Sequence, residues 1–263
     1  MPWQPRWLQV NRGGIGADCQ RETLPRQPAS RHCLHFLVDT VYVPPPHPVG
    51  LRRRLIEAAV ELLAERGPEG TSLREIARRA GVSHGAPLRH FDSLTSLLSE
   101  VAANGFADLE ASVDSAAATA GEHPRARLAA GGRGYLDFAL ANPGVFALMW
   151  RFDLVDFAMP GLAEAGAAVF ASLTRLVESC QRQGWQEKAD TVLVAGALWA
   201  TVHGLAQLWL SGVLASTTRT TSIDAVTEAA FGRLLDDQVF GSAISPPPAR
   251  SKKPTRAPRR KGP

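Results

Sequence analysis

Two short stretches contain the histidine, arginine and hydroxyl side chains whose types and spacing could do chemistry. GVSHGAPLRHF, residues 81–91, offers hydrogen-bond donors and acceptors of the kind that read base edges or phosphates. In WATVHG, residues 199–204, Trp199 and His203 are four residues apart and would share one face of a helix. A general base needs a reacting group beside it, and a metal ion needs several ligands.

No arrangement for catalysis or metal binding accompanies these histidines. The sequence contains no H-x-x-x-H, H-E-x-x-H or C-x-x-C spacing, and its three cysteines, Cys19, Cys33 and Cys180, lack metal-ligand spacing. We therefore expect no enzyme, no metal and no cofactor, and Cys180 should be a small apolar filler in a reducing cytoplasm. The favoured interpretation of His203 is a buried side chain that is hydrogen-bonded between helices, and contact with a ligand is the alternative.

Positive charge is concentrated at the two ends of the chain. The formal net charge is +4, yet residues 244–263 alone contain seven Lys or Arg and no acidic residue. Residues 1–48 contain five Arg and three acidic residues, so the chain between the two ends carries a net negative charge. Both ends are rich in Pro or Gly and lack a sustained apolar period. This composition predicts a disordered extension over residues 1–48 and a disordered basic tail over residues 244–263.

An apolar period of three to four residues predicts an all-α fold through residues 49–243. A stripe led by Leu51 and Leu55 marks the first helix, which Gly67-Pro68 should end. No apolar run reaches the ~18 residues of a membrane span, although residues 191–215 come closest. We therefore expect no membrane contact, and the start of the chain lacks the order of a signal peptide.

A helix-turn-helix is predicted near the start of this helical region. Ser72 and Glu75 have the spacing of a capping box at the start of the second helix. Ala77 and Gly81 are small residues four positions apart, which would let two helices approach closely. Ser83 can cap a short third helix. An ordinary helical hairpin is the alternative to this prediction.

The stretch TSLREIARRAGVSHGAPLRHF, residues 71–91, resembles the signature of the TetR family of bacterial regulators, and the similarity runs from about Leu51 to Val101. The resemblance implies a three-helix DNA-binding domain over residues 49–100 and a helical domain over residues 101–243 that binds a small effector and dimerises. It also implies a function. The protein would be a cytoplasmic transcriptional regulator, in the first place a repressor, that binds a palindromic operator in double-stranded DNA as a homodimer.

Candidate DNA contacts follow from the geometry of such a domain. The first turn of a recognition helix meets base edges, and an arginine further on can reach a guanine or a phosphate. A helix N-terminus suits a phosphate. His90 would contact the backbone or support the fold, and Phe91 should be core. The candidates are Arg52, Thr71, Ser72, Ser83, His84, Gly85, Ala86, Arg89 and His90.

Pro87 is the unusual residue of the predicted third helix. With Ser83 as N-cap, Pro87 would be the fourth helical position, and its ring would press on the carbonyl of Ser83. A cap residue lies half outside the helix, so the cost should be well below the ~3 kcal/mol of a mid-helix proline.

Three positions depart from the family pattern. Leu88 stands where a phosphate-binding Tyr is usual, and Leu94 and Thr95 replace a Lys-Glu pair. The loss of two phosphate contacts favours an alternative, an all-α ligand-binding or interaction protein without specific DNA recognition.

Two aromatic stretches lie in the second domain. YLDFALANPGVFALMW (residues 135–150) and WATVHGLAQLWLSGVL (residues 199–214) resemble a TetR subgroup with a W-x-x-x-H-G signature, here Trp199, His203 and Gly204. Their aromatic side chains either fill the core or line a pocket between helices. Few charged residues interrupt them, so an effector should be apolar or aromatic. The candidate effector contacts are Phe138, Phe146, Trp150, Phe170, Trp199 and His203.

The last two predicted helices, near residues 187–212 and 222–240, are the candidate dimer interface that the resemblance implies. Gly204 would let a neighbouring helix approach. A twofold dimer would present two recognition helices ~34 Å apart, which matches successive major grooves. The alternative is that these helices only close the core of the monomer.

Overall fold

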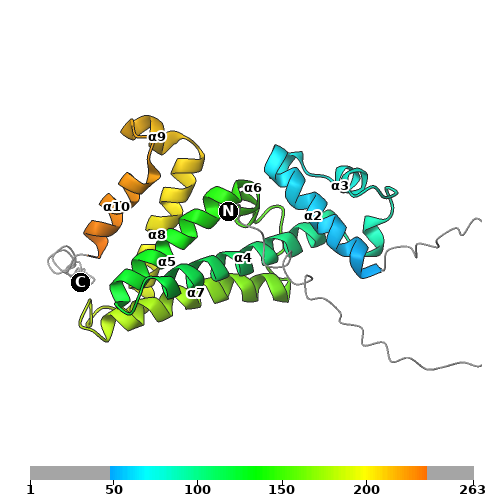
Figure 1. Ribbon diagram of the computed structural model, residues 1–263. Helices are drawn as coiled ribbons and strands as arrows, with labels where there is room; N and C mark the ends of the chain where they lie inside the picture. The colour runs from blue at the N-terminus through cyan, green and yellow to red at the C-terminus, as the bar shows by residue number, and fades with distance from the viewer. Residues whose placement is uncertain (1–47, 236–263) are drawn as a thin grey trace, which may run out of the picture.

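The computed structural model describes residues 48–235, and every regular element within that range is helical (Figure 1). The predicted all-α fold is confirmed for these residues. The expected extension over residues 1–48, apart from its last residue, and the basic tail over residues 244–263 lie outside the described range. The helices are α2 (Pro48–Arg66), α3 (Leu73–Arg79), α4 (Leu94–Thr119), α5 (Pro124–Ala141), α6 (Pro143–Leu148), α7 (Pro160–Gln181), α8 (Thr191–Leu210), α9 (Val213–Thr218) and α10 (Ile223–Leu234), with the 3-10 helices η1 (Pro68–Gly70) and η2 (Pro87–Arg89).

α2, α3 and the start of α4 form a unit at one end of the molecule, in blue and cyan in Figure 1. α2 packs against both α3 and α4, and Leu55, Leu62, Ile76 and Leu97 are fully buried in their shared core. α4 continues past residue 100 into the rest of the molecule. The boundary expected at that residue therefore lies inside one unbroken helix.

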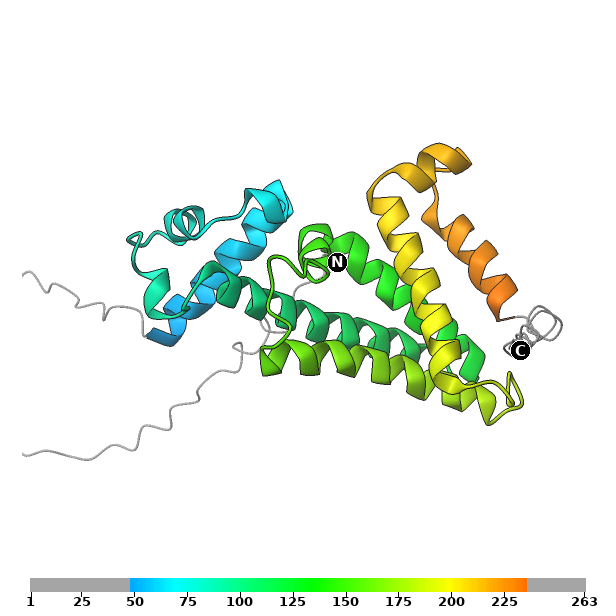
Figure 2. The same ribbon diagram turned by 180° about the vertical axis from the view of Figure 1, so that it is seen from behind.

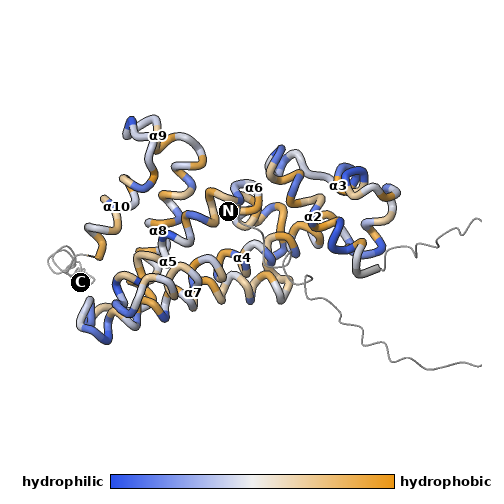
Figure 3. Tube along the Cα trace, viewed as in Figure 1, coloured by the Kyte–Doolittle hydropathy of each residue, from blue (hydrophilic) through white to orange (hydrophobic). Residues whose placement is uncertain are grey.

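The rest of the molecule is a bundle in which α4, α5 and α7 lie side by side (Figures 1 and 2). α8 packs against α5 and α7, and α9 and α10 follow it at the end far from α3. Hydrophobic residues run along α4 inside this bundle, whereas hydrophilic residues gather at the turn between α7 and α8 (Figure 3). One apolar cluster therefore extends from α2 to α10.

A second, smaller apolar cluster lies between α7 and α8. It contains Cys180, which is fully buried with Val177 and Trp185, as expected for a small apolar filler. Burial raises the pKa of the Cys180 thiol to about 11, so the thiol stays protonated near neutral pH.

Two glycines bring helices into close contact. A Cβ on Gly134 of α5 would lie 2.5 Å from the carbonyl oxygen of Ser112 on α4. A Cβ on Gly144 of α6 would lie 2.2 Å from the carbonyl oxygen of Leu63 on α2. Neither distance leaves room for a methyl group, so both helix pairs require glycine at these positions. α6 is thus held directly against the N-terminal unit.

The predicted helix start at Ser72 is confirmed. Its side-chain oxygen accepts a hydrogen bond from the backbone N–H of Glu75 at 3.3 Å. The Glu75 carboxylate is engaged with Arg66 at 3.2 Å and Arg78 at 2.6 Å. Ser93 caps α4 in the same way, accepting from the N–H of Ser96 at 3.0 Å. Side-chain caps therefore fix where these two helices begin.

The end of the chain differs from the prediction of two long helices. α8 begins at Thr191, because the side chain of Asp190 accepts hydrogen bonds from Val192 N and Leu193 N at 2.9 and 3.0 Å. Gly212 adopts φ 76°, which breaks the chain into α8 and the short α9. α10 occupies part of the second predicted helix, and residues 236–240 lie outside the described range.

α8 is more apolar than the sequence prediction allowed. Among the described residues it is the one helix long and apolar enough to cross a membrane, with a hydropathy of 1.4 over its best window. Only 28% of that window is buried. The sequence prediction considered an uninterrupted apolar run, which His203 and Gln207 interrupt, whereas the mean hydropathy of α8 stays high because its polar residues are few. Length and composition alone do not distinguish a membrane span from a helix that packs against protein.

Candidate functional site

The turn after α3 has the geometry expected of a helix-turn-helix. Gly81 adopts φ 66°, a left-handed conformation that glycine accepts without strain. The backbone N–H of Val82 then donates to the carbonyl of Ala77 at 3.0 Å, and Ala77 is buried. Arg54 of α2 donates a hydrogen bond to the carbonyl of Ala80 and so ties this turn to the first helix.

The segment that follows is not the regular helix that was predicted. The N–H of Ala86 bonds to the carbonyl of Ser83 at 3.0 Å, which closes a turn, and η2 begins only at Pro87. Ala86, not Ser83, is the N-cap of that 3-10 helix. Pro87 has no N–H to extend the turn from Ser83, but proline is well suited to a first helical position. The assignment of Pro87 to the fourth position of a helix was therefore wrong.

This irregular segment presents several of the predicted contacts to solvent. Ser83, His84, Gly85 and Arg89 are exposed, and His90 is half-buried. Ala86 is buried, with 9% of its surface exposed, so its side chain contributes to packing. The exposed residues Ser83, His84, Gly85 and Arg89 lie on the stretch of chain that follows α3, at the end of the molecule that carries α3 (Figure 1).

Phe91 is buried, and Arg52 covers it. Phe91 is 2% exposed, as expected for a core residue. The guanidinium of Arg52 lies 4.6 Å from the centre of its ring and forms an ion pair with Glu100 of α4. Arg52 therefore holds α2 against α4, and contact with a phosphate would compete with this ion pair.

The two hydroxyls before α3 have different surroundings. Thr71 is buried, and its hydroxyl donates to the carbonyl of Gly67 at 3.1 Å. Ser72 is exposed, and its oxygen accepts from Glu75, which leaves its own proton free to donate. Of this pair, only Ser72 has an exposed hydroxyl with a free proton at the start of the helix.

Most arginines of α2 and α3 are paired with glutamates. Arg79 contacts Glu65 at 2.6 Å and Glu61 at 3.3 Å, and its hydrogen bond lowers the pKa of Glu65. Within the described part of the chain, exposed Arg74 and Arg89 have no carboxylate partner. Arg74, in the first turn of α3, was missed by sequence reasoning. Its place two residues after the cap Ser72 could have indicated it.

The structure also shows where the three residues that depart from the family pattern lie. Leu88 is 57% exposed, and Thr95 is exposed as well. Leu94 is half-buried and packs against the apolar core as the first residue of α4. Leu88 and Thr95 thus lie on the surface but offer no positive charge to a phosphate.

In the C-terminal part, rings from three helices and one loop gather around His203. Trp150 lies closest, with ring centres 4.7 Å apart, and Phe146 follows at 5.5 Å. Trp199 is 6.1 Å from His203 and connects it to Phe170, also at 6.1 Å. Five of the six predicted effector contacts thus form one connected set, which we call the aromatic cluster: Phe146, Trp150, Phe170, Trp199 and His203.

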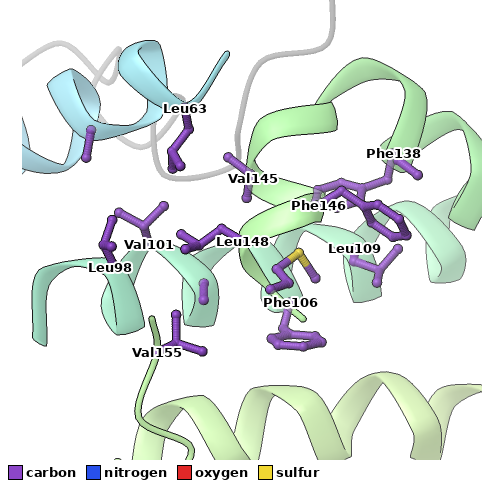
Figure 4. Packing of buried hydrophobic residues seen from close by; sticks show 14 of the residues in the cluster. Leu63, Leu98, Val101, Phe106, Leu109, Phe138, Val145, Phe146, Leu148 and Val155 are labelled. Carbon is purple, nitrogen blue, oxygen red and sulfur yellow. The ribbon is translucent and has the colours of Figure 1, made fainter. Parts of the chain in front are cut away.

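Phe138, the sixth predicted contact, belongs to the interior. It is 2% exposed on α5 and lies beside Phe146 in the buried core (Figure 4). The aromatic cluster by contrast reaches the surface, because Trp199 is 37% exposed. Phe138 therefore lies in the core beside the aromatic cluster and does not reach the surface.

Tyr135 holds His203 in place. Its hydroxyl lies 2.9 Å from Nδ1 of His203, which joins α5 to α8. Burial raises the pKa of Tyr135 and lowers the pKa of His203, so both side chains are neutral near pH 7. The favoured prediction for His203, a hydrogen bond between helices, agrees with this contact. In the sequence, Tyr135 is only the first residue of an aromatic stretch, and nothing local relates it to a histidine 68 positions away.

A row of apolar side chains on α8 and α9 is exposed. Val192, Leu193 and Leu208 of α8 are 57%, 73% and 46% exposed, and Val213 of α9 is 51% exposed. The other side of α8 is buried through Ala195, Leu198, Val202 and Ala206. A Cβ on Gly204 would meet no heavy atom within 4 Å, so no helix of the described chain approaches there. α8 therefore has one packed side and one unpartnered apolar side.

Two family profiles match this chain. The profile described as "Bacterial regulatory proteins, tetR family" matches residues 55–101, and "Tetracyclin repressor-like, C-terminal domain" matches residues 128–236. Together they cover more than half of the sequence. The first match contains α3 and the exposed segment after it, and the second contains the aromatic cluster and α8.

Individual relatives agree with this assignment. An HTH-type transcriptional repressor of Mycobacterium tuberculosis is 47% identical over 47 residues, 18% of this chain and 25% of that protein. The repressor KstR2 of Rhodococcus jostii is 42% identical over 59 residues, 22% of this chain and 28% of that protein. The chain thus spans only about a quarter of these curated relatives. The structure of a protein of unknown function from Rhodococcus sp. RHA1 is 37% identical with a TM-score of 0.65, covering 73% of this chain and 96% of that one.

Proposed function

The chain belongs to the tetR family of bacterial regulatory proteins, and we propose that it is a cytoplasmic, homodimeric transcriptional repressor released from its operator by a small apolar effector. The observation that carries the proposal is the exposed segment Ser83–Gly85 with Arg89, which the Gly81 turn holds next to α3. This segment has hydrogen-bonding groups and little role in the core. Segments of this kind read base edges in a major groove.

The phosphate contacts of this surface differ from the family pattern. Ser72 at the start of α3 is available to phosphates, together with the cations Arg74 and Arg89, which have no carboxylate partner among the described residues. They replace the Tyr and Lys that Leu88 and Leu94 do not supply. Few cations of the described residues are available, so the contribution of this domain to the salt dependence of DNA affinity should be moderate, since the slope follows the number of phosphates neutralised.

The exposed side of α8 supports the homodimer. A second copy would bury Leu193 and Leu208, which lie on the same exposed side of α8, against the same residues by twofold symmetry. Exposed apolar patches of this kind mark interaction surfaces in proteins that act in water. The buried side of α8 and the bond between Tyr135 and His203 anchor the helix to the bundle. We therefore infer a protein partner rather than a membrane. Two copies related in this way could read the two halves of a palindrome.

α6 is the element that could transmit effector binding to the DNA-binding unit. It carries Phe146 of the aromatic cluster, and its Gly144 lies against Leu63 of α2. Figure 4 shows Val145 and Leu148 of α6 lying among Leu63 and Val101. Trp150 lies two residues beyond the end of α6, and the next residue, Arg151, pairs with Glu69 of η1. An effector that favours one position of this segment would therefore favour one position of α2.

Genomic capture followed by a reporter assay tests the proposed function. The full-length protein is incubated with sheared DNA of its own organism, bound fragments are sequenced, and one fragment is placed before a reporter gene. We expect discrete fragments and lower reporter expression when the protein is present. Capture without any sequence preference would contradict the proposed DNA recognition, and higher expression would contradict repression.

A further inference from the structure

The aromatic cluster contains two neutral hydrogen-bond donors, and its chemistry restricts the ligand. Nε1 of Trp150 is buried and has no hydrogen-bond partner within the described part of the chain. A buried N–H without a partner costs free energy that a bound acceptor would recover. Trp150 contacts His203, Phe146 and Trp199 through its ring, so this donor lies within the aromatic cluster.

His203 supplies the second donor. The Tyr135 hydroxyl is buried and protonated, and donating to Nδ1 of His203 satisfies its proton. In that arrangement the proton of the neutral imidazole is on Nε2. Nε2 is the nitrogen that Tyr135 does not use, and it can donate to another group. With this tautomer, His203 is a donor toward a ligand.

The absence of charge in the aromatic cluster favours a neutral hydrogen-bond acceptor over a charged one. All members of the aromatic cluster are neutral near pH 7, and burial disfavours the protonated form of His203. A carboxylate held among these rings would be a buried charge without a paired cation, which is costly. A ketone, ester or lactone carbonyl accepts the same hydrogen bonds without that cost. The rings themselves suit a flat or aromatic body.

We propose that the effector is an uncharged, flat or aromatic carbonyl compound whose oxygen accepts a hydrogen bond from Trp150 Nε1–H, with His203 Nε2–H as the second donor. This inference rests on the proposed effector site and adds the chemical class of the ligand. Neither a pure hydrocarbon nor a carboxylate meets both requirements. The hydrocarbon leaves the Trp150 donor unpaired, and the carboxylate brings an uncompensated charge.

Three matched probes test the proposal with the full-length protein. Methyl 2-naphthoate has a neutral carbonyl, 2-naphthoate has a carboxylate, and 2-propylnaphthalene has no acceptor. Dissociation constants are measured by thermal shift and by quenching of tryptophan fluorescence at pH 7. We expect the ester to bind at least ~10-fold more tightly than either other probe, the ratio that one well-placed hydrogen bond supports.

The variant Trp150→Phe keeps a ring in place but removes the N–H, so the preference for the ester over the alkyl probe should fall to about 3-fold or less. Trp185→Phe is the matched control. Trp185 also has a buried N–H without a partner in the described chain, but it lies in the other apolar cluster, beside Cys180. Its substitution should leave the preference unchanged.

Several results would overturn the proposal. The first is that the ester binds no more tightly than the other two probes, or does not bind at all. The second is that Trp150→Phe still prefers the ester over the alkyl probe as strongly as the wild type does. The third is that Trp185→Phe loses this preference to the same extent as Trp150→Phe. Capture of genomic fragments by the same preparation separates this inference from the proposed function. If the protein captures DNA fragments selectively but does not prefer the ester, only the proposed ligand class is refuted. If it prefers the ester but does not capture fragments selectively, only the proposed function as a DNA-binding regulator is refuted.

Discussion

The hydroxyl of Tyr135 lies 2.9 Å from Nδ1 of His203, and this contact joins α5 to α8 beside the aromatic cluster. Tyr135 is 4% exposed, so loss of either partner leaves a poorly solvated polar group behind. The pair therefore holds α8 in position against α5.

Removing the Tyr135 hydroxyl should destabilise the protein. Tyr135→Phe keeps the ring but leaves Nδ1 of His203 without this partner, so we expect the free energy of unfolding to fall by about 1–2 kcal/mol. A double-mutant cycle with His203→Phe, measured by urea unfolding, should give a coupling energy above ~0.5 kcal/mol. Purely additive effects of the two substitutions would show that the pair does not interact.

His203 should also make stability depend on pH. Burial lowers its pKa below the ordinary value of 6.5. As the pH falls through about 6.5, the unfolded chain takes up this proton before the folded chain does. The resulting stabilisation is full above that pH and is lost progressively as the pH falls to the lowered pKa. His203→Gln removes this titration from the folded protein. The difference in unfolding free energy between wild type and variant should therefore shrink between pH 7.5 and 5, and parallel curves would contradict this.

Gly144→Ala tests the contact between α6 and α2. The added Cβ would meet the carbonyl oxygen of Leu63 at 2.2 Å, so the helices must separate. We expect a loss of ~1–3 kcal/mol of stability and weaker DNA binding, because α2 positions the reading segment. Gly161→Ala is the control, since a Cβ there meets nothing within 4 Å. Equal effects of the two substitutions in urea unfolding and DNA-binding titrations would rule out a special role for the α6–α2 contact.

Arg89 and Arg79 should differ in their effect on DNA binding. Arg89 is exposed without a carboxylate partner among the described residues, whereas Arg79 is paired with Glu65 and Glu61. Arg89→Ala should weaken binding by ~1–3 kcal/mol if it contacts a base, or lower the salt slope by about 1 if it contacts a phosphate. Arg79→Ala should leave the salt slope unchanged. Fluorescence anisotropy titrations at several salt concentrations measure both, and an unchanged affinity for Arg89→Ala would remove it from the interface.

The sequence was most informative where local rules decide the structure. The cap at Ser72, the glycine turn at Gly81 and the buried Phe91 all depend on neighbouring residues, and each is found as predicted. The segment after Ser83 was not, because the prediction extended a helix through Pro87 although proline more readily begins a new turn there.

Contacts between distant residues could not be predicted from spacing. Tyr135 and His203 meet only because α5 and α8 pack together. Likewise, the need for glycine at position 144 comes from a carbonyl on α2. Arg52 shows the same limit, since its charge suggested a phosphate contact while the fold pairs it with Glu100. The sequence patterns identified most of the aromatic cluster, but not the hydroxyl that orients its histidine.

In vitro selection of DNA by the purified full-length protein tests the central claim most directly. The protein is incubated with random duplex DNA over several rounds, and the bound pool is sequenced. We predict an enriched palindrome whose half-sites are centred about one helical turn, or a multiple of it, apart. Enrichment should be lost when Ser83, His84 and Arg89 are all replaced by alanine. A pool that remains random through all rounds would contradict a dimeric, sequence-specific DNA-binding protein.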